Sequence, residues 1–125
     1  GGRPFILGGN SGVDTQPQAQ LQQFLGVIEF GLSAQGAIDR PRFVSTAFPS
    51  SNYPYEVGGT LQMEQGFPER LYQGLRERGH EVVVGEGIFG TANMVVMAEE
   101  GADAEVGAES RSGGTASGSV VPAAR

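Results

Sequence analysis

The sequence contains no cysteine and no tryptophan, and all 8 of its basic residues are arginine. Without cysteine the chain has no disulfide, no thiolate metal ligand and no cysteine nucleophile, and its redox compartment stays undecided. Without lysine it has neither a Schiff-base amine nor the lysine of a phosphate-binding P-loop. Its apolar runs are all shorter than the roughly 20 residues of a membrane-spanning helix, so we expect no membrane span in this chain.

The charge balance and the length bear on the kind of partner and on the number of domains. The 125 residues include 14 acidic side chains and one histidine, for a net charge of −6. Nucleic-acid binding depends on clustered positive charge, so we expect no nucleic-acid partner. The length fits one domain at most, and the sequence opens on glycine without an initiator methionine. We therefore expect a segment of a larger protein.

Apolar periodicity and helix-ending signals predict two helices in the first third of the chain. A short strand over residues 4–7 leads into a glycine-rich loop. The following helix has Pro17 in its first turn and ends near Gly31, and its apolar residues Leu21, Phe24, Leu25 and Ile28 predict one buried face. Ser33 caps a second, short helix that continues through Asp39.

The rest of the chain alternates between predicted strands and one further helix. Strands are expected over residues 42–46, 60–64 and 81–84, with a helix opening at Pro68, and residues 92–98 pair as a hairpin with residues 104–108. The sequence therefore predicts an α+β fold with mixed strand pairing. We assign residues 1–108 to the folded segment and residues 109–125 to a partly disordered tail.

Three patterns have ordinary structural explanations that we favour. Gly85 to Gly90 match the glycine spacing of a dinucleotide site, but an apolar β-type run follows instead of a helix. His80 is the only general base available to Ser11, yet it follows a helix-ending glycine, a position that is usually exposed. The acids from Glu99 to Glu109 lack the spacing of a calcium loop and read as a solvated turn. We expect no cofactor and no metal.

The segment from Gly8 to Asp14 carries the strongest functional signal. A glycine-rich loop that enters a helix presents backbone N–H groups, and these can bind an anion or a developing oxyanion. A plain strand-to-helix turn is the alternative, and physical reasoning from the residues alone leaves both open.

Several motifs in the same order resemble the γ-glutamyltransferase family. Residues 12–18 read G-V-D-T-Q-P-Q where one branch of the family has G-G-D-x-Q-P-Q, and residues 37–43 read A-I-D-R-P-R-F. The similarity continues through residues 67–69, 75–82 and 89–93 to Gly107–Arg111, near the C-terminal end. It covers nearly the whole chain, as the later part of the small subunit.

This resemblance implies an N-terminal-nucleophile hydrolase with an αββα sandwich, made as one precursor that cleaves itself into two subunits. The nucleophile would be a threonine upstream of this chain, with its own α-amine as base. The partners would be the large subunit and the N-terminal part of the small subunit, and the substrate a small-molecule amide of γ-glutamyl type. A cytoplasmic location is expected, with a periplasmic or secreted one left open.

The resemblance also implies an oxyanion hole made by the N–H groups of Gly12 and Val13, with Asp14 as a substrate-binding candidate. The family has a second glycine where this chain has Val13, and a β-branched residue resists positive φ. Either Val13 keeps a negative φ or the hole is altered. Three readings follow: a γ-glutamyl-type hydrolase or transferase, a divergent biosynthetic hydrolase acting on another amide or a C–C bond, and a non-catalytic homologue.

Overall fold

A computed structural model describes residues 4–85, 89–97 and 103–111 of the chain. Along these residues the elements are β1 (Ile6–Asn10), the 3₁₀ turn η1 (Val13–Thr15), α1 (Gln16–Ile28), α2 (Ala34–Asp39), β2 (Phe43–Ser45), β3 (Thr60–Glu64), α3 (Glu69–Glu77), β4 (Glu81–Gly85), β5 (Ala92–Met97) and β6 (Ala104–Ala108). The predicted order of helices and strands is confirmed, with β1 beginning two residues later and extending into the glycine-rich segment.

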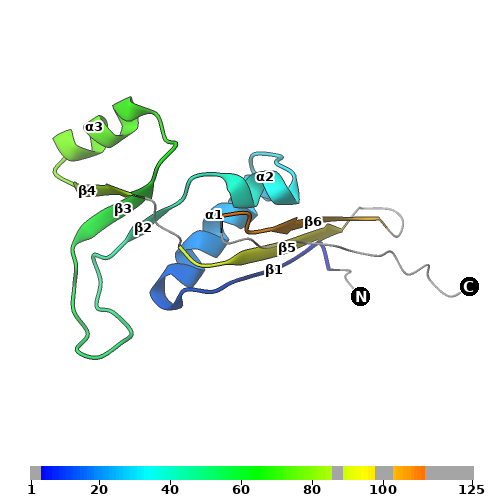
Figure 1. Cartoon of the computed structure of the whole chain (residues 1–125), viewed down its shortest axis with the longest axis horizontal. Coiled ribbons are helices and arrows are strands. Elements are labelled where there is room, and N and C mark those ends of the chain that lie inside the picture. The colour runs from blue at the N-terminus through cyan, green and yellow to red at the C-terminus, as the bar shows by residue number, and fades with distance from the viewer. Residues whose placement is uncertain (1–3, 86–88, 98–102, 112–125) are drawn as a thin grey trace, which may run out of the picture.

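The strands form two three-stranded sheets. Sheet A has the order β1-β5-β6 and is antiparallel throughout, which confirms the predicted hairpin of β5 and β6. Sheet B has the order β2-β3-β4, with β2 antiparallel and β4 parallel to β3. The helix α3 connects β3 to β4, as a parallel pair requires. Figure 1 shows α1 and α2 beside sheet A, and α3 beside sheet B at the opposite end of the molecule.

The core lies between α2 and sheet A. Ala34 and Ile38 from α2 meet Ala92 and Met94 from β5, and all four are at most 2% exposed. Ile6, Phe24, Val27 and Val96 pack around them. Helices against one sheet and a second, mixed sheet make this an α+β fold, as predicted.

The predicted buried face of α1 is wrong for three of its four residues. Leu21 and Ile28 are each 58% exposed and Leu25 is 38% exposed, while α1 instead buries Ala19, Gln23 and Gly26. The reason is the close packing of α1 on α2. A Cβ atom on Gly26 would lie 3.0 Å from the Cβ of Ala37, so only small residues fit at this crossing. The periodicity identified a helix but not which side of it faces the core.

Two glutamines of α1 bind the outer edge of β2. The Gln22 amide accepts from the Phe43 N–H at 3.1 Å and donates to the Phe43 carbonyl at 2.8 Å. Gln18 makes the same pair of bonds with Ser45. Residues four apart on a helix rise about 6 Å, close to the spacing of alternate strand residues, so the two glutamines match the two edge positions. This pairing joins α1 to sheet B.

Truncation of the core residue Ile38 should destabilise the chain far more than truncation of an outer residue of α1. We expect Ile38→Ala to lower the free energy of unfolding by about 2–5 kcal/mol, because its side chain is fully buried. Leu21→Ala, the control, should cost about 0.5 kcal/mol or less. Denaturant unfolding of the full-length protein measures both, and equal losses would contradict the packing described here.

Candidate active site: the Gly12–Val13 loop and its support

The loop after β1 has two consecutive residues with positive φ. Gly12 has φ 121° and Val13 has φ 51°. The alternative in which Val13 keeps a negative φ is therefore wrong. The left-handed region is strained for a β-branched residue, and residues held in such conformations are concentrated at functional sites. The strain at Val13 therefore indicates that this loop is the candidate functional site.

The loop is closed on its carbonyl side and open on its amide side. The Gly12 carbonyl accepts from the Thr15 N–H at 3.0 Å and from the Thr15 hydroxyl at 2.7 Å. Among the residues that the structure describes, the N–H groups of Gly12 and Val13 donate to no acceptor. A Cβ atom on Gly12 would lie 2.3 Å from the Thr15 hydroxyl oxygen, so the loop itself, as well as its positive φ, requires glycine there.

Gly12 and Val13 line a cleft of about 400 Å³. One wall is the loop with Asp14 and Thr15, and the opposite wall comes from β2, β3 and the segment that joins them. The facing residues are Val44, Ser45, Thr46, Phe48, Ser50, Glu56, Gly58, Thr60 and Gln62. The cleft is thus lined on one side by the two residues whose N–H groups are unbonded within the described part of the chain, and on the other by mixed apolar and hydroxyl groups.

Asp14 is held against the facing segment. Its carboxylate accepts from the Ser51 N–H at 3.0 Å. Hydrogen bonds from the Ser51 side chain and backbone, and a weaker one from Ser50, lower the pKa of Asp14 despite the opposing effect of desolvation. The Asp14 carboxylate is thus ionised at neutral pH and bound to the facing segment.

Hydrogen bonds between Thr46 and Thr60 close the base of the facing segment, residues 47–58. The Thr46 N–H donates to the Thr60 carbonyl at 2.9 Å, and the Thr46 hydroxyl accepts from the Thr60 N–H at 3.0 Å. Gly59 closes the same neck by donating to the Thr46 carbonyl at 3.0 Å. Residues 47–58 therefore form a loop whose two ends are fixed next to each other on sheet B.

The segment 89–91 supports the Gly12 loop from behind. The buried Asn10 amide donates to the Phe89 carbonyl at 3.0 Å and to the Ser11 carbonyl at 2.6 Å. The Ser11 N–H donates to the Thr91 carbonyl at 3.0 Å, and the Ser11 hydroxyl accepts from the Thr91 N–H at 2.8 Å. A Cβ atom on Gly90 would lie 1.6 Å from the Ser11 carbonyl oxygen. The two backbones are therefore in direct contact.

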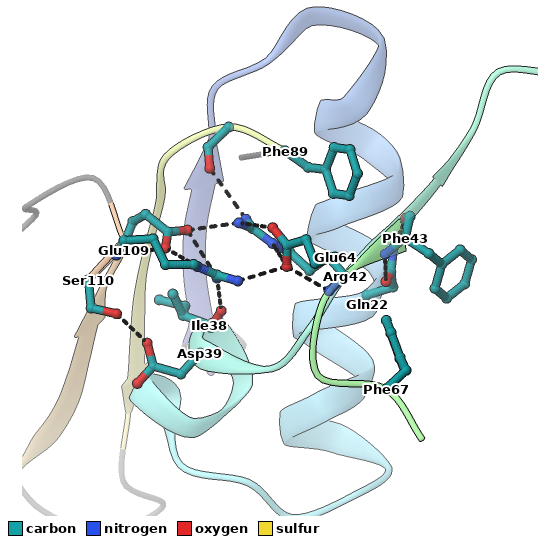
Figure 2. A network of polar contacts seen from close by, with 12 residues as sticks. Gln22, Ile38, Asp39, Arg42, Phe43, Glu64, Phe67, Phe89, Glu109 and Ser110 are labelled. Carbon is teal, nitrogen blue, oxygen red and sulfur yellow. Dashed lines mark hydrogen bonds and ion pairs between the residues drawn. The ribbon is translucent and has the colours of Figure 1, made fainter. Parts of the chain in front are cut away.

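Two arginines and two glutamates form a buried ion network beside this segment (Figure 2). Arg42, 1% exposed, pairs with Glu64 at 3.0 Å and with Glu109 at 3.1 Å. Arg111 pairs with Glu64 at 2.7 Å and with Glu109 at 2.5 Å. The charges balance, and partial burial of Arg111 is outweighed by its hydrogen bond with Glu109 and by nearby carboxylates, so its pKa is raised. The network joins the start of β2 and the end of β3 to the segment after β6.

Arg42 and Arg111 also bind backbone carbonyls. The Arg42 guanidinium donates to the Gly90 carbonyl at 3.3 Å, and the Arg111 guanidinium donates to the Ile38 carbonyl at 2.6 Å. Arg42 thus bonds directly to the segment that supports the Gly12 loop, whereas Arg111 reaches the C-terminal part of α2.

The network bears on two expectations from the sequence. Glu109 is fully buried and ion-paired, so the interpretation of that residue as part of a solvated acidic turn is wrong. Glu99 and Glu100 lie outside the described residues. The expected tail was to begin at residue 109, but Glu109 and Arg111 pack into the network, and most of the remaining tail lies outside the described part of the chain.

The contacts of the other candidate residues, His80, Ser11 and Gly90, are made with or by the backbone. His80 is exposed just before β4, and its backbone N–H donates to the Leu75 carbonyl. The Ser11 hydroxyl accepts from the Thr91 N–H. Gly90, the last glycine of the dinucleotide-like pattern, leads into β5 rather than a helix. The middle of that pattern, residues 86–88, lies outside the described residues. No helix in the described part is long and apolar enough to cross a membrane.

Comparison with known proteins agrees with the resemblance found in the sequence. The sequence model described as Gamma-glutamyltranspeptidase matches residues 1–119. The chain belongs to this family. It is 35% identical over 121 residues to the glutathione hydrolase-like YwrD proenzyme of Bacillus subtilis, which covers 94% of this chain and 22% of the relative.

Acylases are similar to the chain as well. The acylase ACY 1 proenzyme of a Pseudomonas species (strain SE83) is 30% identical over 97 residues, or 78% of this chain and 15% of that protein. The crystal structure of cephalosporin acylase from Bacillus halodurans superposes with a TM-score of 0.72 at 31% identity, over 87% of this chain and 19% of that one. The chain therefore spans about a fifth of the length of the relatives it matches.

Substitution of Val13 by glycine should remove backbone strain. We expect Val13→Gly to stabilise the chain by about 1–2 kcal/mol, the usual cost of a left-handed conformation for a residue with a Cβ. Gly31 has φ 62° with nothing near its Cβ position, so Gly31→Val is the matched reverse control and should lose a similar amount. Thermal unfolding of both variants measures this, and a destabilised Val13→Gly would contradict the strain.

The lowered pKa of Asp14 should depend on Ser51. Ser51→Ala removes the largest stabilising hydrogen bond to the carboxylate and should raise the pKa of Asp14 toward its ordinary value, whereas Ser50→Ala should raise it less. Because the folded-state pKa is lowered, the stabilisation is present above the ordinary aspartate value of about 3.9 and is lost as the pH falls through the folded-state value. Carboxyl NMR titration tests the order of the two variants.

Proposed function

We propose that this chain supplies the oxyanion-hole loop of an enzyme that cleaves an amide bond through a threonine nucleophile outside the chain. The hydroxyl oxygen of that threonine would attack the carbonyl carbon while its α-amine takes the hydroxyl proton, and the carbonyl electron pair would move onto the carbonyl oxygen. The amine would leave as the C–N bond breaks, with a proton delivered by the nucleophile's α-amine. Water or an acceptor amine would then release the acyl group from the threonine.

The observation that carries this proposal is the pair of open N–H groups at Gly12 and Val13 on the wall of the cleft. Backbone donors that are fixed before the reaction and free of other acceptors are what a developing oxyanion requires. Because Val13 does not keep a negative φ, the second alternative from the sequence applies: the proposed hole is an altered one, with a strained valine where the family has glycine.

The relatives support amide substrates but not one in particular. The YwrD proenzyme carries a name related to glutathione hydrolysis, while the other curated relative is an acylase. Both are proenzymes, and this supports the large subunit and the upstream part of the small subunit as partners of this chain. Asp14, which is ionised and lines the cleft, is our candidate for a contact to the substrate.

Removal of the Val13 N–H alone tests the proposal. In the full-length, processed protein, replacement of Val13 by its α-hydroxy acid exchanges the N–H for an ester oxygen and keeps the side chain. We expect kcat to fall about 100- to 1,000-fold with KM nearly unchanged, as for other lost oxyanion donors.

The same replacement at Leu32 is the matched control. It removes an N–H that donates to the Gly26 carbonyl of α1, away from the loop, so it should affect stability more than turnover. Gly12→Ala is a poor substitute, because the added methyl group would meet the Thr15 hydroxyl and change the loop. Unchanged turnover with the Val13 ester would refute the oxyanion role.

A further inference from the structure

We propose that Arg42 is a positioning residue for the Gly12–Val13 loop, acting through the Gly90 carbonyl. This inference rests on the proposed function for its effect on turnover, but not for its effect on the loop. Arg42 binds neither Gly12 nor Val13, and it does not line the cleft. Val44 and Ser45, which follow it on β2, do line the cleft.

The first step is the bond from Arg42 to Gly90. The Arg42 guanidinium is held in a single orientation by Glu64 and Glu109, which bind it at 3.0 and 3.1 Å. Its N–H backbone group also donates to Glu64, at 2.8 Å. A guanidinium has five donors in a rigid fork, so it can pair with both carboxylates and still donate to the Gly90 carbonyl.

The second step is the contact of Gly90 with the loop. Gly90 has φ 83°, and the position of a Cβ on it would overlap the Ser11 carbonyl. The Cβ position of Gly12 lies 3.4 Å from the Gly90 Cα. A shift of segment 89–91 would therefore move the backbone that leads into Gly12 and Val13, and errors of about 1 Å in such donors are costly to catalysis.

Arg42→Lys in the full-length, processed protein tests this inference. Lysine keeps the positive charge, but its three donors lie on one nitrogen and lack the planar fork with which the guanidinium spans both carboxylates and the Gly90 carbonyl. We expect kcat to fall roughly tenfold or more, with KM little changed. We also expect faster hydrogen exchange at the Ser11 and Thr15 amides, which donate to the Thr91 and Gly12 carbonyls, with no change in α3.

Arg111→Lys is the matched control, since Arg111 pairs with the same two glutamates but reaches the Ile38 carbonyl instead of Gly90. It should lower the melting temperature while kcat per folded molecule and exchange at the Ser11 and Thr15 amides stay as in the parent protein. Arg40→Lys controls for a general effect of the change, because Arg40 is exposed and stacks over the Phe30 ring.

The outcomes separate the two proposals. Unchanged exchange at the Ser11 and Thr15 amides in Arg42→Lys, or an equal effect of Arg111→Lys on kcat, would overturn the positioning role. Faster exchange with unchanged kcat would keep the mechanical link and overturn the oxyanion role of the loop. If Arg42→Lys does not fold, Asn10→Asp loosens the same segment through its bonds to the Phe89 and Ser11 carbonyls, and the same two measurements apply.

Discussion

The ion network of Arg42, Arg111, Glu64 and Glu109, in which Arg111 is partly exposed, is the constraint on which the arrangement of this chain depends. Sheets A and B share no strand, and their relative position has to come from side chains. Each arginine binds both glutamates, so the segment after β6 is fixed to the ends of β2 and β3. Loss of one member leaves an uncompensated buried charge, which typically costs about 3–5 kcal/mol. With two arginines and two glutamates the charges of the network balance, whereas a single arginine–glutamate pair would leave guanidinium donors without a carboxylate.

The same ion network explains why the loop between β1 and α1 can keep an unfavourable backbone. A valine at φ 51° persists only if its surroundings hold it there. On one side Thr15 binds the Gly12 carbonyl, and on the other the segment 89–91 packs against Ser11. That segment is in turn bonded to Arg42. The strain at the loop is thus balanced by interactions that lie mostly outside it.

Much of the fold followed from the sequence, because helix caps, strand alternation and turn glycines act locally. Ser33 accepts the N–H of Gly36 as its position predicted, and Gly31 adopts the left-handed conformation that ends α1. The buried side of α1 did not follow, since it is set by the small residues at the crossing with α2. Glu109 could not be separated from its acidic neighbours either, because its partners come from residues 42 and 111 and only the fold brings them together. At the candidate site, the positions of Gly12 and Val13 came from the family resemblance, whereas the sign of φ at Val13 and the role of Gly90 required the structure.

The threonine neck of the segment facing the Gly12 loop has an evolutionary consequence. Thr46, Gly59 and Thr60 close residues 47–58 into a loop that makes its own local bonds, such as the one from the Ser50 N–H to the Glu56 carbonyl at 2.9 Å. Mutations and insertions between the two threonines leave the register of β2 and β3 unchanged. This wall of the cleft can therefore change in sequence and length while the bonds at its base stay fixed, and the bond from the Ser51 N–H to Asp14 links it to the opposite wall.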